Sequence, residues 1–81
     1  MDDEPLLGGY EDLPLEAAEK IHTFIHNKLK IRPELELTKY ERQVVAGFNH
    51  ILTYIFKDKS ARVHVFEDMD GEYSQPIILG R

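Results

Sequence analysis

Apolar residues in the first third of the chain recur every three or four positions, with polar residues between them. The stripe consists of Ala17, Ala18, Ile21, Phe24, Ile25 and Leu29. This period predicts an amphipathic α-helix. Asp12 is a suitable N-cap residue, and Pro14 is favoured just inside a helix start. Because Pro33 disfavours helical geometry in the residue before it, we expect the helix to end near Lys30.

After Pro33 the pattern changes to a period of two, which is typical of half-buried strands. Residues 34–37 alternate strictly, and the alternation slips once before it continues through residues 40–45, which indicates a β-bulge. Residues 48–56 form the next predicted strand. Two shorter strands are expected at residues 61–67 and 76–79.

Short polar segments separate these strands. Residues 57–60 form one predicted turn, and residues 68–72 contain an Asp-Gly pair, which is a strong hairpin signal. One helix followed by four antiparallel strands predicts an α+β fold, with the helix packed across one face of the sheet. We therefore expect the 81 residues to form a single domain, 1–81, in which residues 1–12 are a flexible amino-terminal arm.

Composition narrows the function classes. Fifteen acidic and ten basic residues give a net charge of −5, which argues against binding to nucleic acid or to an anionic membrane. The chain has no cysteine, and this excludes disulfide bonds and cysteine nucleophiles. The start of the chain is acidic and lacks the apolar segment of a signal peptide, so we expect a cytoplasmic protein.

The residues that usually carry chemistry do not form a recognisable motif. His22 and His26 have a spacing that suits zinc, but no third ligand is evident, so we interpret them as ordinary boundary histidines. His50 and His64 are explained by packing between strands. The acidic residues of 67–72 miss the spacing of a calcium-binding loop. We therefore expect no catalytic residues, no bound metal and no cofactor, and we do not expect an enzyme.

Three segments remain that combine exposed apolar residues with glycine. They are the arm residues Leu6, Leu7, Gly8 and Gly9, a first loop at residues 43–47 (Gln43, Val44, Val45, Ala46 and Gly47), and a second loop at residues 68–72, with Met69, Asp70 and Gly71 at its tip. Alternate turns of an antiparallel meander fall at the same end of the sheet, so the two loops should lie together. If the helix also begins at that end, the arm joins them, and the three segments form a narrow wedge that fits a cleft in a partner.

These segments resemble the cystatin superfamily of cysteine-protease inhibitors. Residues 43–47 reproduce its Gln-Val-Val-Ala-Gly motif in full, and Gly8-Gly9 is similar to the amino-terminal glycine pair of the stefins, the cystatins without disulfides. Residues 63–81 are similar to a strand–loop–strand segment of the stefins. The second loop differs, because stefins commonly carry Leu-Pro-Gly there and secreted cystatins carry Pro-Trp.

The resemblance implies a reversible, competitive inhibitor that blocks the active-site cleft of papain-like cysteine proteases such as cathepsins. In this interpretation the arm and both loops contact the protease. The active form is then a monomer, and opening of the first loop could give an inactive domain-swapped dimer. The alternative is a natural or engineered cystatin-like scaffold that binds a partner without inhibiting a protease.

Overall fold

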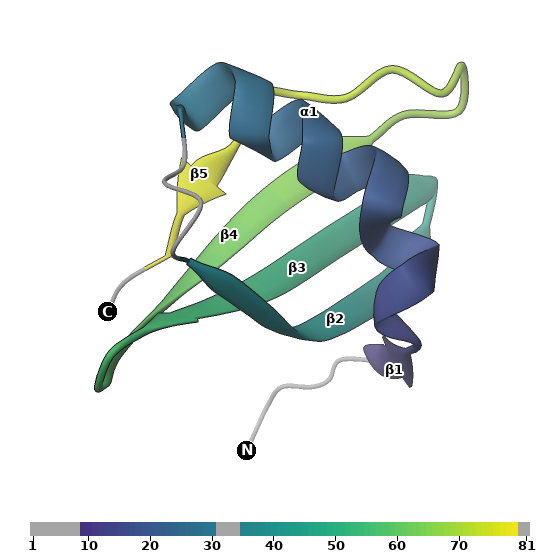
Figure 1. The fold of residues 1–81 in the computed structure, drawn as a ribbon. Coiled ribbons are helices and arrows are strands. Elements are labelled where there is room, and N and C mark those ends of the chain that lie inside the picture. Colours follow the sequence, from purple (N-terminus) through teal and green to yellow (C-terminus); the bar gives the residue numbers. More distant parts are fainter. Residues whose placement is uncertain (1–8, 31–34, 80–81) are drawn as a thin grey trace.

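The computed structural model describes residues 9–30 and 35–79, and shows one α-helix packed across a five-stranded antiparallel sheet (Figure 1). This arrangement confirms the α+β class predicted from the sequence. Neighbouring strands in the sheet are also neighbours in the chain, in the order β1-β2-β3-β4-β5. The elements are β1 (Glu11–Leu13), a 3₁₀ helix (Leu15–Ala18), α1 (Glu19–Leu29), β2 (Glu36–Val45), β3 (Gly47–Phe56), β4 (Lys59–Glu67) and β5 (Ile77–Ile78).

Strand β1 was not predicted. It pairs with β2 through Glu11 opposite Arg42, Asp12 opposite Glu41, and Leu13 opposite Tyr40. The expectation that the flexible arm extends to residue 12 is therefore wrong, because residues 11 and 12 belong to the sheet. Three residues, two of them acidic, give no strand pattern of their own. Their conformation depends on the edge that β2 offers.

The predicted helix start is also wrong, while its end is confirmed. Asp12 lies in β1, and Pro14 precedes the 3₁₀ helix, where its carbonyl accepts a hydrogen bond from the Ala17 N–H at 3.0 Å. The α-helix begins only at Glu19. It ends at Leu29, where Lys30 takes a left-handed conformation (φ 55°) and donates its N–H to the His26 carbonyl at 2.9 Å.

The long strands follow the sequence pattern closely. A register shift between Leu37 and Lys39 confirms the predicted bulge in β2. Val45 pairs with Gly47 at the end of the first hairpin, which places Ala46 at its tip. At the next hairpin Phe56 pairs with Lys59. The last strand is shorter than expected, because β5 contains only Ile77 and Ile78.

The core lies between the helix and the face of the sheet that it covers. The helical segment contributes Ala18, Ile21 and Ile25, and the sheet contributes Tyr40, Leu52, Tyr54, Val63 and Val65. Burial of each large aliphatic side chain stabilises the fold by about 1.5–3 kcal/mol. The Tyr54 hydroxyl lies 2.7 Å from Nδ1 of His22 and so joins the sheet to the helix through a hydrogen bond. Within the described residues, no helix is long and apolar enough to span a membrane.

Candidate functional site

The first and second loops lie at the same end of the sheet, as the meander topology predicts. Phe48, just after the first loop, pairs with Glu67, just before the second. The turn between β3 and β4 lies at the opposite end (Figure 1). The relative position of the two loops is therefore fixed by the pairing of β3 with β4.

Gly9 is the only arm residue of the candidate site that the structure describes, since Leu6, Leu7 and Gly8 lie outside the described residues. Strand β1 runs antiparallel to β2, and its first residue, Glu11, pairs with Arg42 near the first loop. Gly9 precedes Glu11 by two residues and is exposed, with a φ of 30°. The chain therefore enters the sheet at the end that carries both loops.

The first loop presents apolar side chains to solvent. The exposed fraction is 61% for Val44 and 45% for Val45, and Ala46 is exposed as well. Residues that follow one another in a strand point to opposite faces, so Val44 lies on the helix side of the sheet and Val45 on the other side. Such exposure is unfavourable for the free protein, and contact with an apolar partner would remove it.

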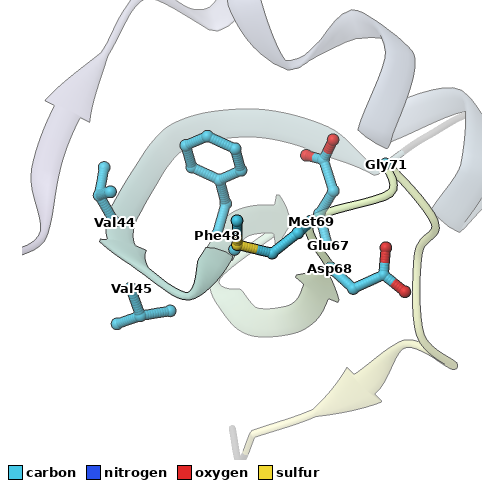
Figure 2. Close-up of a pocket in the computed structure, with 8 residues that line it drawn as sticks. Val44, Val45, Phe48, Glu67, Asp68, Met69 and Gly71 are labelled. Carbon is cyan, nitrogen blue, oxygen red and sulfur yellow. The ribbon is translucent and has the colours of Figure 1, made fainter.

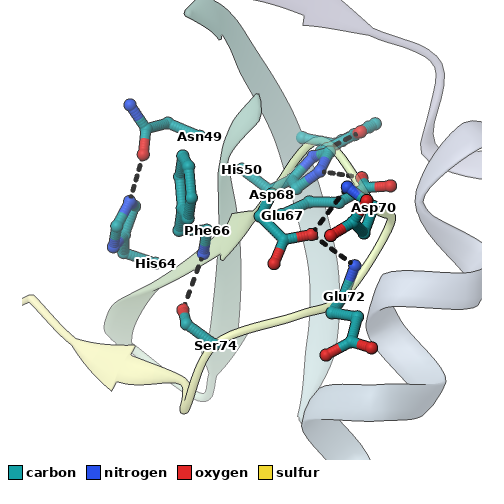
Figure 3. A network of polar contacts seen from close by, with 10 residues as sticks. Asn49, His50, His64, Phe66, Glu67, Asp68, Asp70, Glu72 and Ser74 are labelled. Atoms are coloured by element: carbon teal, nitrogen blue, oxygen red, sulfur yellow. Dashed lines mark hydrogen bonds and ion pairs between the residues drawn. The ribbon is translucent and has the colours of Figure 1, made fainter. Parts of the chain in front are cut away.

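Gln43, at the start of the first loop, is held by a chain of side-chain hydrogen bonds on the face of the sheet away from the helix. The Asn49 Nδ2 donates to the Gln43 Oε1 at 2.9 Å. The Asn49 Oδ1 then lies 2.9 Å from Nε2 of His64 (Figure 3). Because Oδ1 can only accept, the His64 Nε2 must carry the hydrogen. Partial burial, and secondarily the neighbouring His50, lower the pKa of His64.

The second loop is ordered by the side chain of its first residue. The Asp68 Oδ1 accepts the backbone N–H of Asp70 at 2.9 Å and that of Glu72 at 3.0 Å (Figure 3). The Asp68 carbonyl also accepts the N–H of Gly71 at 3.0 Å. With its backbone held in this way, the loop leaves Met69 80% exposed.

A shallow groove with a volume of about 270 Å³ runs between the two loops (Figure 2). Its lining residues are Val44, Val45, Gly47, Phe48, Glu67, Asp68, Met69 and Gly71. The surface is mostly apolar, and its charged side chains are both carboxylates. Of the predicted loop residues, the structure brings Val44, Val45, Gly47, Met69 and Gly71 around one groove, whereas Gln43, Ala46 and Asp70 do not line it. The side chains of Val44, Val45 and Met69 are exposed. Such a surface is suited to binding a partner.

The histidines are the other residues of the described chain with side chains suited to chemistry. The rings of His22 and His26 lie with centroids 6.3 Å apart and tilted by 49°. Among residues 9–30 and 35–79, no group of three or more His, Asp or Glu side chains could hold a metal ion. Sequence reasoning missed the connections of His50 and His64 to the loops. Their partners are 17 and 15 residues away along the chain, so only the strand register reveals them.

The comparisons add no family assignment to this description. Searches against protein-family models, curated proteins and solved structures found no match. The resemblance of residues 43–47 to the cystatin motif therefore stays a prediction. The structure shows an α+β fold with one helix on a five-stranded antiparallel sheet.

Proposed function

We propose that the protein is a reversible, competitive inhibitor of papain-like cysteine proteases. The observation that carries the proposal is the first loop, where Val44 and Val45 stand exposed at a hairpin tip within a complete Gln-Val-Val-Ala-Gly motif. Met69 lies at the neighbouring tip across the groove. The exposed side chains of Val44, Val45 and Met69 together form an apolar edge. The edge would enter the active-site cleft and exclude substrate.

Preorganisation supports tight binding by this edge. The first loop is held by strand pairing up to Val45 and Gly47, and the second by the hydrogen bonds of Asp68. Because the backbone is already ordered, docking costs little conformational entropy. Covering the exposed apolar tips adds a favourable hydrophobic contribution, of which only the surplus over the cost of association appears as affinity.

The same pairing explains how the loop would resist cleavage. A protease hydrolyses a peptide bond that lies extended against its catalytic residues. In the first loop, the peptide bonds between Val45 and Gly47 are part of a closed hairpin turn. A productive alignment would require the hairpin to open.

The arm is proposed to bind beside the first loop. Gly9 lies at the same end of the sheet as the loops, and the preceding Leu6 and Leu7 would reach the non-primed subsites of the protease. Gly8 and Gly9 would let the backbone approach the partner closely. The absence of cysteine fits a reducing compartment, and we propose the cytoplasm.

A titration of active papain with the purified monomer tests the proposal. We expect competitive inhibition with a one-to-one endpoint, and intact inhibitor by mass spectrometry after prolonged incubation. Deletion of residues 1–7 should mainly increase the dissociation rate, since it removes contacts without altering the described fold. Absence of inhibition at micromolar protein would contradict the proposal.

One observation favours a second candidate, a cystatin-like scaffold that does not inhibit. The second loop carries Asp68, Asp70 and Glu72 around Met69, where stefins carry apolar residues. These acids would oppose docking into an acidic or apolar cleft. A folded monomer that leaves papain, cathepsin-type and other papain-like proteases fully active would support the scaffold.

A further inference from the structure

His50 occupies the core directly behind the groove and is only 3% exposed. Its two ring nitrogens both have partners. Nδ1 lies 2.9 Å from the Tyr40 hydroxyl on β2, and Nε2 lies 2.9 Å from Oε1 of Glu67 at the end of β4. One buried imidazole thus connects three strands, and its last partner is a residue that lines the groove.

The chemistry of the partners fixes the direction of both hydrogen bonds. An ionised Glu67 carboxylate can only accept, so Nε2 of His50 donates to it. Burial lowers the pKa of His50, and the nearby Arg42 lowers it further, although Glu67 acts in the opposite direction. A neutral ring with hydrogen on Nε2 leaves Nδ1 to accept from the Tyr40 hydroxyl. The rings of Phe48 and Tyr73 pack around it, at centroid distances of 6.0 and 6.3 Å.

Glu67 stands where the groove meets the second loop. It pairs with Phe48 in the sheet and is followed directly by Asp68, whose side chain holds the loop backbone. The bond to His50 turns the Glu67 carboxylate inward, away from the exposed apolar tips. Without that bond, the carboxylate would be free to turn toward solvent in the groove that Glu67 lines.

We propose that His50 is a positioning residue that holds Glu67 and thereby shapes the groove and the base of the second loop. It holds the partly buried Glu67 carboxylate against the wall of the groove that Val44 and Met69 also line. The consequence for inhibition rests on the proposed function, whereas the effect on the groove and loop does not.

Amide hydrogen exchange in the second loop tests the structural part. His50→Leu fills the space but removes the donor to Glu67. We expect amide exchange at Gly71 and Glu72 to become at least about tenfold faster than in the wild-type protein, after correction for any change in global stability. Tyr40→Phe is the matched control, because it removes the other hydrogen bond of the same ring and leaves the Glu67 contact intact. His50→Gln, whose Nε2 can still donate, should restore slow exchange. Equal exchange in His50→Leu and Tyr40→Phe would overturn the proposal.

A double variant tests whether His50 acts through Glu67. If papain is inhibited, His50→Leu should weaken inhibition about tenfold or more, because a released carboxylate must be desolvated on docking. Combining His50→Leu with Glu67→Leu removes that carboxylate and should recover most of the lost affinity. No recovery in a folded double variant would overturn the coupling. If the wild-type chain does not inhibit at all, the exchange experiment still decides the role of His50.

Discussion

The ring of Phe66 lies against the backbone of Gly47, so closely that a side chain at residue 47 has no room. A β-carbon there would stand 2.9 Å from Cζ of Phe66 and would overlap the carbonyl oxygen of Glu67. Gly47 also has a φ of 116°, which residues with a side chain rarely adopt. The hairpin itself therefore requires glycine at residue 47.

Gly47→Ala should consequently destabilise the free protein. We expect a loss of at least about 2 kcal/mol in the free energy of unfolding, from backbone strain and from displacement of β4. Urea denaturation measures it. Gly71→Ala is the control, since residue 71 also has a positive φ (84°), but its β-carbon would meet nothing closer than 3.9 Å. Equal losses in the two variants would mean that strain alone matters at residue 47.

The chain from His64 through Asn49 to Gln43 gives a second prediction. Asn49→Asp replaces the amide donor by a carboxylate, so the Gln43 amide must turn to present its own N–H groups. We expect inhibition of papain to weaken about tenfold, which corresponds to the loss of one hydrogen bond to a charged or buried group. Calorimetry of binding measures it, and Thr53→Val, on the same face of β3 but further from the first loop, should have no effect. Unchanged affinity in Asn49→Asp would show that the orientation of the Gln43 amide does not affect binding.

Features that depend on the local sequence pattern were predictable, whereas features that depend on the pairing of strands were not. The stripe of Ile21, Ile25 and Leu29 predicted the helix, and the alternation of 48–56 predicted β3. Even the common end of the two loops followed from counting hairpins. Strand β1 was missed because an acidic three-residue segment becomes a strand only beside β2.

The candidate site divides in the same way. Val44, Val45 and Met69 could be selected because exposed apolar residues in turns are unusual wherever they occur. His50 could not be assigned to Glu67, because that contact depends on the register of β3 against β4, which pairs His50 with Val65 and Phe48 with Glu67. Packing of His50 between strands was a correct interpretation, but it did not identify the partners.

Because His50 is buried and His64 is half-buried, we expect the stability of the protein to fall in mild acid. Burial lowers the pKa of His50 and of His64 below the value near 6.5 of the unfolded chain. Between the unfolded and the folded pKa, the unfolded chain binds more protons than the native protein. The free energy of unfolding should therefore be highest above about pH 7 and decline as the pH falls through about 6.5.

Urea denaturation at several pH values between 5 and 8 measures this decline. His50→Gln removes one titrating group while keeping a donor for Glu67, so the slope of stability against pH should become shallower. Asn27→Gln is the control, because residue 27 is exposed and carries no titrating group, so its substitution should leave the slope unchanged. A stability that rises on acidification from pH 7 would contradict the burial argument.

Val45 and Val65 offer the clearest separation of contact from packing. Val45 is 45% exposed at the first loop, while Val65 is fully buried in the core. Val45→Asp places a charge where the proposed inhibitor contacts its protease, and a charge in a desolvated contact is strongly unfavourable. We expect at least about a hundredfold loss of inhibition with less than about 0.5 kcal/mol change in folding stability. Val65→Ala should behave in the opposite way, losing about 2 kcal/mol of stability while the folded fraction inhibits normally.

A thermal melt and a papain titration on both variants, each run on the monomer fraction, decide between contact and packing. If Val45→Asp unfolds the protein while the surviving monomer inhibits fully, the first loop serves packing, and the proposed contact edge is wrong.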